Sequence, residues 1–252
     1  MSGALEWSIL GPAFLAGLVV LTTHVPLGRE VLARGIVFID LAVAQIAALG
    51  VIAAHGLGLE HSPLAIQLAA AAAALLGALL MTWTERRWPA LQEALIGAAF
   101  VLAASASLLL LAGNPHAGER LQDLLAGQIL WVTYPQIGVV ALLSALLLAV
   151  RHFLGERLGR VGFYLVFALA VTASVQLVGV YLVFASLILP ALATRGAPLR
   201  AQTPRGYALG ALGYGVGLLA SAGWDLPSGP AIVWALALLA LASRLCWRPS
   251  RS

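Results

Sequence analysis

Long apolar stretches separated by short polar gaps make up almost the whole of this 252-residue chain. A transmembrane helix needs about 20 consecutive, mostly apolar residues, and nine stretches come close to that length. They run over 8–25, 35–54, 63–83, 93–112, 132–150, 161–177, 179–194, 206–222 and 230–247. The pattern therefore predicts an all-α fold, a polytopic bundle of about nine transmembrane helices in a single domain over 1–252, with eight as the alternative count.

The segment 161–194 contains two of the three shortest predicted spans. Two helices of about 17 residues reach only about 25 Å each, less than the roughly 30 Å of the hydrocarbon core. We expect either a plain short hairpin in a thinned bilayer or a partly re-entrant pair that turns near Gly179. Pro190 removes a backbone hydrogen bond from the second helix. Gly179 and Pro190 are therefore the expected kink or gate, and a static bend is the alternative at Pro190.

Arginine supplies all 14 basic residues, because the chain contains no lysine. Thirteen of the arginines fall in alternate gaps between the apolar stretches: 29 and 34, 86 and 87, 151, 157 and 160, 195, 200 and 205, and 244, 248 and 251. Cationic side chains next to apolar spans stay on the cytoplasmic side. The alternation predicts an amino terminus outside and a carboxyl terminus inside. The net charge of +4 does not indicate nucleic-acid binding, since the arginines lie in separate short loops.

The composition excludes several classes of function. Only 10% of the residues are charged, against about 25% in soluble domains. A single cysteine, Cys246, allows no intrachain disulfide and no cysteine metal cluster. Without lysine the chain has no Walker A loop, and it contains no HExxH or GxSxG motif. We therefore expect a transporter subunit and not an enzyme, with any ATP hydrolysis in a separate partner subunit.

Two acidic residues lie inside predicted spans, where an ionisable group is costly and usually faces a cavity or a partner. Asp40 follows Arg34 by six residues, and Glu93 follows Arg87 by six. Six helical residues rise about 9 Å, so both carboxylates reach a similar depth from one side, where they can share a divalent cation. The alternatives are a structural hydrogen bond for Asp40 and a helix-start or snorkelling role for Glu93. Gln45 is a candidate for the transport pathway or for an interhelical hydrogen bond.

Three sequence elements occur in a recognisable order. The first is HVPLG at 24–28, followed by the span that contains Asp40 and ends in AALG at 47–50. The second is VGVYLVFASLILPALATR at 178–195, and the third is DLPSGPAIV at 225–233. Together they resemble the ABC-3 family, the permease subunits of ABC transporters for zinc, manganese and iron. The order and spacing of the elements extend the resemblance over most of the chain.

The resemblance implies a permease that pairs with a second copy in the bacterial inner membrane. It implies cytoplasmic ABC ATPase subunits and an extracytoplasmic metal-binding protein as partners, surrounding membrane lipid, and no cofactor bound by the chain, with a divalent metal ion as the transported substrate. Asp40 matches the family's metal-contacting aspartate. The family's histidine four residues later is Ala44 here, and the next residue, Gln45, is a poor zinc ligand. The choice of metal therefore stays open.

The inner loops offer two candidates for the surface that contacts the ATPase. The first is the segment Leu154, Gly155, Glu156, Arg157, Leu158 and Gly159, and the second is 195–205. A different class of function also fits the intramembrane carboxylates. A secondary transporter coupled to protons would use Asp40 or Glu93 as the proton carrier, and it would need no ATPase.

Overall fold

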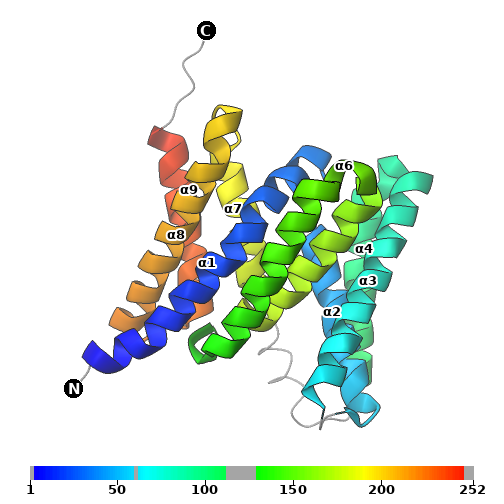
Figure 1. Cartoon of the computed structure of the whole chain (residues 1–252), viewed down its shortest axis with the longest axis horizontal. Coiled ribbons are helices and arrows are strands. Elements are labelled where there is room, and N and C mark those ends of the chain that lie inside the picture. The colour runs from blue at the N-terminus through cyan, green and yellow to red at the C-terminus, as the bar shows by residue number, and fades with distance from the viewer. Residues whose placement is uncertain (1–2, 60–61, 112–128, 247–252) are drawn as a thin grey trace. The chain divides into compact units, whose positions relative to one another are not determined.

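The computed structural model describes residues 3–59, 62–111 and 129–246, and every regular element within these ranges is a helix (Figure 1). The α-helices are α1 (Gly3–Arg34), α2 (Ile39–Gly56), α3 (Pro63–Arg87), α4 (Gln92–Leu111), α6 (Tyr134–Val178), α7 (Val180–Thr194), α8 (Leu199–Trp224) and α9 (Ser228–Cys246). Two short 3-10 helices, η2 (Pro89–Leu91) and η3 (Ile129–Trp131), precede α4 and α6. Each of the nine predicted stretches falls on one of these helices, so the prediction of an all-α fold is confirmed.

Six helical segments in the described ranges are long and apolar enough to cross a membrane. They are Trp7–Arg34, Ile39–Gly56, Pro63–Arg87, Pro89–Leu111, Tyr134–Leu154 and Gly159–Val178. The apolar helices Val180–Thr194 and Ser228–Arg244 are shorter. The 15 residues of α7 reach about 22 Å at 1.5 Å per residue, so this helix is short, as its sequence predicted.

Helix α6 joins the fifth and sixth predicted spans without an intervening loop. The loop expected over 151–160 is helical instead, and the helix is broken only at Gly159, where φ is 54° and ψ is −137°. Side chains other than glycine are strained at this positive φ. The loop prediction was wrong because hydropathy marks where a chain leaves the membrane, whereas a helix rich in Arg, Leu and Glu continues readily into water.

The helices divide into two compact units, and α6 contributes to both. The first unit contains α1, α7, α8 and α9 together with α6 up to Ser144.

Within the first unit, α1 and α8 run antiparallel, because residues of increasing number along α1 contact residues of decreasing number along α8. The pairs are Gly17 with Tyr214, Leu21 with Gly210, Val25 with Gly206, and Arg29 with Gln202. Small residues allow such helices to approach closely where no hydrophobic effect drives them together.

Helix α9 is antiparallel to α8 through a second glycine series. Gly213 lies against Leu236, and Gly217 lies against Ile232. The approach at Gly217 is so close that an added Cβ would lie 2.8 Å from the backbone nitrogen of Ile232. The same register, continued along both helices, brings Arg205 of α8 level with Arg244 of α9. The arginines of these two helices therefore share one end of the unit.

The second unit contains α2, α3, α4 and the part of α6 from Ala145 to Gln176. Helices α2 and α3 are antiparallel, with Gly50 against Ala73 and Ile46 against Gly77. Helix α4 runs parallel to α2, since Glu93 and Ser107 of α4 are bonded to Phe38 and Gln45, in the same order along the chain. Helices α1, α8 and α9 thus alternate in direction, and so do α2, α3 and α4.

Candidate functional site

Asp40 lies in the first turn of α2 and is buried, with 1% of its surface exposed. Gly35 adopts a φ of 72° between α1 and α2, and Asp40 follows it by five residues. One carboxylate oxygen, Oδ1, has no hydrogen-bond partner within the described chain. A buried acceptor without a partner is costly, and a carboxylate in the first helical turn is favoured by the amide dipoles. The position suits an oxygen that receives a partner during function.

Glu93 belongs to α4 and lies beside the start of α2, the helix that carries Asp40. It is in the first turn of α4, and its Oε1 accepts a hydrogen bond of 3.3 Å from the backbone amide of Phe38. Its second oxygen, Oε2, is buried without a partner. Glu93 therefore contacts Phe38, which precedes Asp40 by two residues in the chain.

The two carboxylates do not complete a metal centre by themselves. Among the residues that the structure describes, no group of three or more His, Cys, Asp or Glu side chains is placed to hold a metal ion. A resident, tightly bound metal would need more protein ligands than this. A transported ion needs binding sites that are weak enough to release it. Whether Asp40 and Glu93 contact a transported ion stays a prediction.

Gln45 connects two helices of the second unit. Its side chain is buried in α2, and its Nε2 donates a hydrogen bond of 3.5 Å to Oγ of Ser107 in α4. The Ser107 hydroxyl in turn donates to the Ala103 carbonyl at 2.9 Å. The adjacent Ala44 is also buried. Gln45 is therefore placed as an interhelical hydrogen-bonding group, the second of the two roles that its sequence allowed.

A buried polar cluster around Gln92 was not expected from the sequence. Its Nε2 donates to the Met81 carbonyl at 3.0 Å and to the Tyr164 hydroxyl at 3.2 Å, and its Oε1 accepts from Oγ1 of Thr84 at 3.0 Å. These bonds join the end of α3, the start of α4 and the second half of α6. The only signal was a glutamine next to Glu93, and glutamines at helix starts are usually solvated.

His24 is a second buried polar residue that was not expected to have a role of its own, since the sequence showed it only as the first residue of the HVPLG element. It is fully buried in α1, and its Nδ1 lies 2.9 Å from the Val20 carbonyl one turn earlier. If Nδ1 carries the proton, it donates to that carbonyl and leaves Nε2 as an acceptor. Nε2 has no partner in the described chain. The first unit therefore also contains one unsatisfied buried nitrogen.

Gly179 precedes the short helix α7, and Pro190 lies inside it, four residues before its end. Gly179 separates α6 from α7 and adopts φ 81° and ψ 165°, a region that is essentially restricted to glycine. The break at this residue is where the sequence placed the turn. Pro190 is buried inside a helix that continues to Thr194, whose hydroxyl donates to the Pro190 carbonyl at 2.8 Å. Whether Pro190 gates the pathway stays a prediction.

The first candidate for the ATPase contact lies at the break in α6. Leu154 and Arg157 are exposed, and Gly159 forms the break itself. The side chains of Gly155, Glu156 and Leu158 lie outside the described residues. Two exposed side chains therefore precede a glycine-dependent break in the helix, and a docking role for this segment stays a prediction.

The second candidate, 195–205, is attached to the end of α1. Arg29 donates through Nε to Oε1 of Gln202 at 3.0 Å and through a second nitrogen to Oγ1 of Thr203. Gln202 also donates to the Ala197 carbonyl at 2.9 Å. The connection between α7 and α8 is therefore held by side-chain hydrogen bonds from another helix.

The comparisons with known proteins agree with this architecture. A model of the ABC 3 transport family matches residues 6–158 and 155–246. A solved structure, PsaBC from Streptococcus pneumoniae in complex with Fab, is similar in fold, with a TM-score of 0.74 over 93% of this chain and 90% of that chain. The sequence identity is 20%, so this likeness concerns the fold. The family matches cover most of a multi-pass helical chain, and the protein is therefore a member of the ABC 3 transport family.

Proposed function

We propose that this chain is the membrane-spanning permease subunit of an ATP-driven importer for a divalent metal ion. The observation that carries the proposal is the buried Asp40, with an unpartnered oxygen, inside a chain of the ABC 3 transport family. Asp40 matches the metal-contacting aspartate that the sequence resemblance implied. The permease forms a pathway with a second copy of itself in the bacterial inner membrane, with its amino terminus outside.

Asp40 and Glu93 are the proposed contacts of the transported ion. Each has one buried oxygen without a partner, and both belong to the second unit. Carboxylate oxygens suit Mn²⁺, whereas zinc sites usually include imidazole or thiolate. With Ala44 in place of a histidine, the donor set favours manganese or ferrous iron over zinc. Gln45 supports the site by holding α2 against α4.

The energy for transport comes from a separate ABC ATPase in this proposal, because the chain has no lysine for a phosphate-binding loop. Its docking surface is the segment of α6 from Leu154 to Gly159, in which Leu154 and Arg157 are exposed, with 195–205 as the second contact. A metal-carrying binding protein delivers the ion from outside. ATP hydrolysis then belongs to the partner, and this chain is not an enzyme.

The test is co-expression of this chain with a candidate ATPase, followed by purification of the complex in nanodiscs. The expected result is a stable complex whose ATP hydrolysis rises when the metal-loaded binding protein is added. Arg157→Glu should weaken the association, and Arg86→Glu, an exposed arginine at the end of α3, is the matched control. Uptake driven by a pH gradient in liposomes that contain this chain alone would favour the proton-coupled alternative and overturn the proposal.

A further inference from the structure

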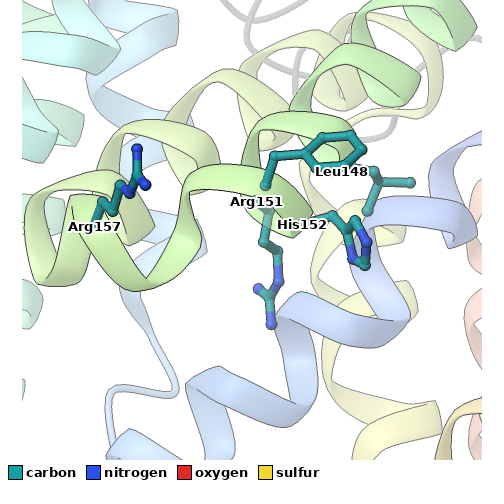
Figure 2. Close-up of a pocket in the computed structure, with 5 residues that line it drawn as sticks. Leu148, Arg151, His152 and Arg157 are labelled. Carbon is teal, nitrogen blue, oxygen red and sulfur yellow. The ribbon is translucent and has the colours of Figure 1, made fainter.

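Of the three histidines that the structure describes, only His24 is fully buried. His55 is partly exposed in the last turn of α2. His152 is exposed, and it lines a hollow at the end of the first half of α6 together with Arg151 and Arg157 (Figure 2). Guanidinium groups stay positively charged and repel a cation. His24 is therefore the described imidazole that lies in the apolar interior, shielded from water.

Hydrogen bonds fix the tautomer of the neutral His24 ring. A carbonyl oxygen can only accept a hydrogen bond, so Nδ1, which lies 2.9 Å from the Val20 carbonyl, carries the proton and donates it. The Thr23 hydroxyl lies 3.1 Å from the same nitrogen. Nε2 consequently presents a lone pair, and it has no partner in the described chain. Histidines that bind a metal ion through one nitrogen usually donate the other N–H to a carbonyl or carboxylate in this way.

The face of α1 that carries His24 packs against α7 and α8. Residues 17, 21, 24 and 28 follow one another at spacings of four, three and four, which places them on one face of a helix. The contacts of this face all lie within the first unit: Gly17 with Tyr214, Leu21 with Gly210, and Gly28 with Leu187. His24 lies between these contacts, so its ring is on the side of α1 that α7 and α8 cover.

Helix α7 runs parallel to α1. Ser186 of α7 is bonded to Tyr214 of α8, and Pro190 lies against Gly206, so residues of increasing number in α7 meet residues of decreasing number in α8. Because α8 is antiparallel to α1, α1 and α7 have the same direction.

A pair of buried hydroxyls lies level with His24. Gly28 lies against Leu187, so His24, one turn earlier in α1, is level with the turn of α7 that contains Ser186. The hydroxyl oxygens of Ser186 and Tyr214 are 2.9 Å apart, and both residues are fully buried. An imidazole nitrogen and two hydroxyls therefore come from three helices at one level of the first unit.

We propose that Nε2 of His24 is a further contact of the transported divalent ion and that it selects a transition metal against Mg²⁺ and Ca²⁺. Both of these ions take oxygen ligands, so the carboxylates of Asp40 and Glu93 do not reject them. An imidazole nitrogen favours first-row transition metals, with affinity rising from Mn²⁺ through Fe²⁺ to Co²⁺. This inference rests on the proposed function, and it supplies the nitrogen donor that Ala44 does not provide.

The contact forms when α7 moves relative to α1, because His24 is fully buried in the conformation described. Gly179, with a φ of 81°, and Pro190, which has no amide N–H, are the residues of this segment where the sequence predicts a kink or gate. Movement of α7 at these residues uncovers the face of α1 that carries Nε2. The nitrogen and the nearby hydroxyls are neutral, so they hold the ion weakly enough to release it.

The experiment uses the full chain, purified without a histidine tag and placed in nanodiscs, with Co²⁺ as the probe because it stays divalent in air. X-ray absorption at the cobalt edge should show the outer-shell scattering of a bound imidazole in the wild type. His24→Gln should lose this scattering and lower the preference for Co²⁺ over Mg²⁺ by about tenfold, as loss of a partner does at metal sites. His55→Gln is the matched control and should change neither reading, because His55 has the same bond from Nδ1, to the Val51 carbonyl at 2.8 Å, at a partly exposed position.

Two further variants separate this role from a structural one and from the carboxylate contacts. His24→Leu removes a buried nitrogen that lacks a partner, so it should keep or raise the unfolding temperature while the metal preference falls as in His24→Gln. Asp40→Asn should weaken the binding of Co²⁺ and Mg²⁺ alike and keep the imidazole scattering; unchanged binding would count against the proposed function and not against His24. The role of His24 is overturned if the wild type shows no imidazole scattering, or if both His24 variants keep the wild-type preference.

Discussion

The helices inside each of the two units are held together by different interactions. In the first unit, α1, α8 and α9 meet through glycines whose Cα atoms lie against a neighbouring helix, as Gly217 lies against Ile232. In the second unit, glycines still join α2 to α3, but α4 is fixed by buried side-chain hydrogen bonds from Gln45 and Gln92. Both unpartnered carboxylate oxygens of the proposed pathway are in the second unit. The proposed transport contacts therefore lie in the unit whose helices are joined by buried glutamine side chains.

The glycine packing of the first unit can be broken by a single methyl group. Gly217→Ala places a Cβ against the backbone of Ile232, and overpacking of this kind costs about 3 kcal/mol. We expect a loss of that size in the free energy of unfolding, measured in mixed micelles. Gly223→Ala is the control in the same helix, because no atom lies within 4 Å of its added Cβ. It should be neutral or stabilising by up to about 1 kcal/mol; equal losses at both positions would refute close packing.

The break between α6 and α7 depends on the backbone conformation of Gly179. Gly179→Ala forces a side chain into φ 81° and ψ 165°, which costs about 2 kcal/mol. The loss should appear as a lower unfolding temperature of the detergent-solubilised protein. Gly138→Ala, inside α6 with open space around its Cβ, should not lower it. A tolerated Gly179→Ala would mean that the chain passes this point in a different conformation.

The polar bonding of the second unit predicts a smaller but specific loss. Gln92→Leu keeps a side chain of similar size and removes three hydrogen bonds, to Met81, Thr84 and Tyr164. We expect about 1–2 kcal/mol of destabilisation, because the Tyr164 hydroxyl loses a buried partner. Gln67→Leu, exposed on α3, is the matched control and should have no measurable effect. Equal stability of the two variants would show that the cluster contributes nothing.

The smallest expected effect tests a polar contact in the glycine-packed unit. Arg29→Gln removes the hydrogen bonds to Gln202 and Thr203 at a partly buried site, with an expected cost of about 1 kcal/mol. Hydrogen exchange at 197–203 should quicken, since this connection loses its attachment to α1. Unchanged exchange there would indicate that α7 and α8 hold the connection without Arg29.

The sequence predicted the fold well because the membrane imposes a simple length rule. All nine apolar stretches fall on helices, and the break near Gly179 was expected. The helical continuation through Arg151 and Arg157 was missed, since apolar length does not report where a helix ends. Partners across helices, such as Ser107 for Gln45, could not be read from one sequence, because the rotation and register of each helix are set by packing. Asp40 is a candidate because a carboxylate in a span is rare, and its role in transport stays a prediction.

The most direct test of the central claim is ATP-driven uptake of Mn²⁺ into proteoliposomes that contain this chain and a co-expressed candidate ATPase. Asp40→Asn keeps the size of the side chain and replaces a carboxylate oxygen with an amide nitrogen, and it should lower the initial rate by about tenfold or more, as loss of even an outer-shell partner does at metal sites. Asp225→Asn, outside the spans at a left-handed position that asparagine tolerates, should leave the rate unchanged. Equal rates for wild type and Asp40→Asn, with a folded and ATPase-bound variant, would contradict the account.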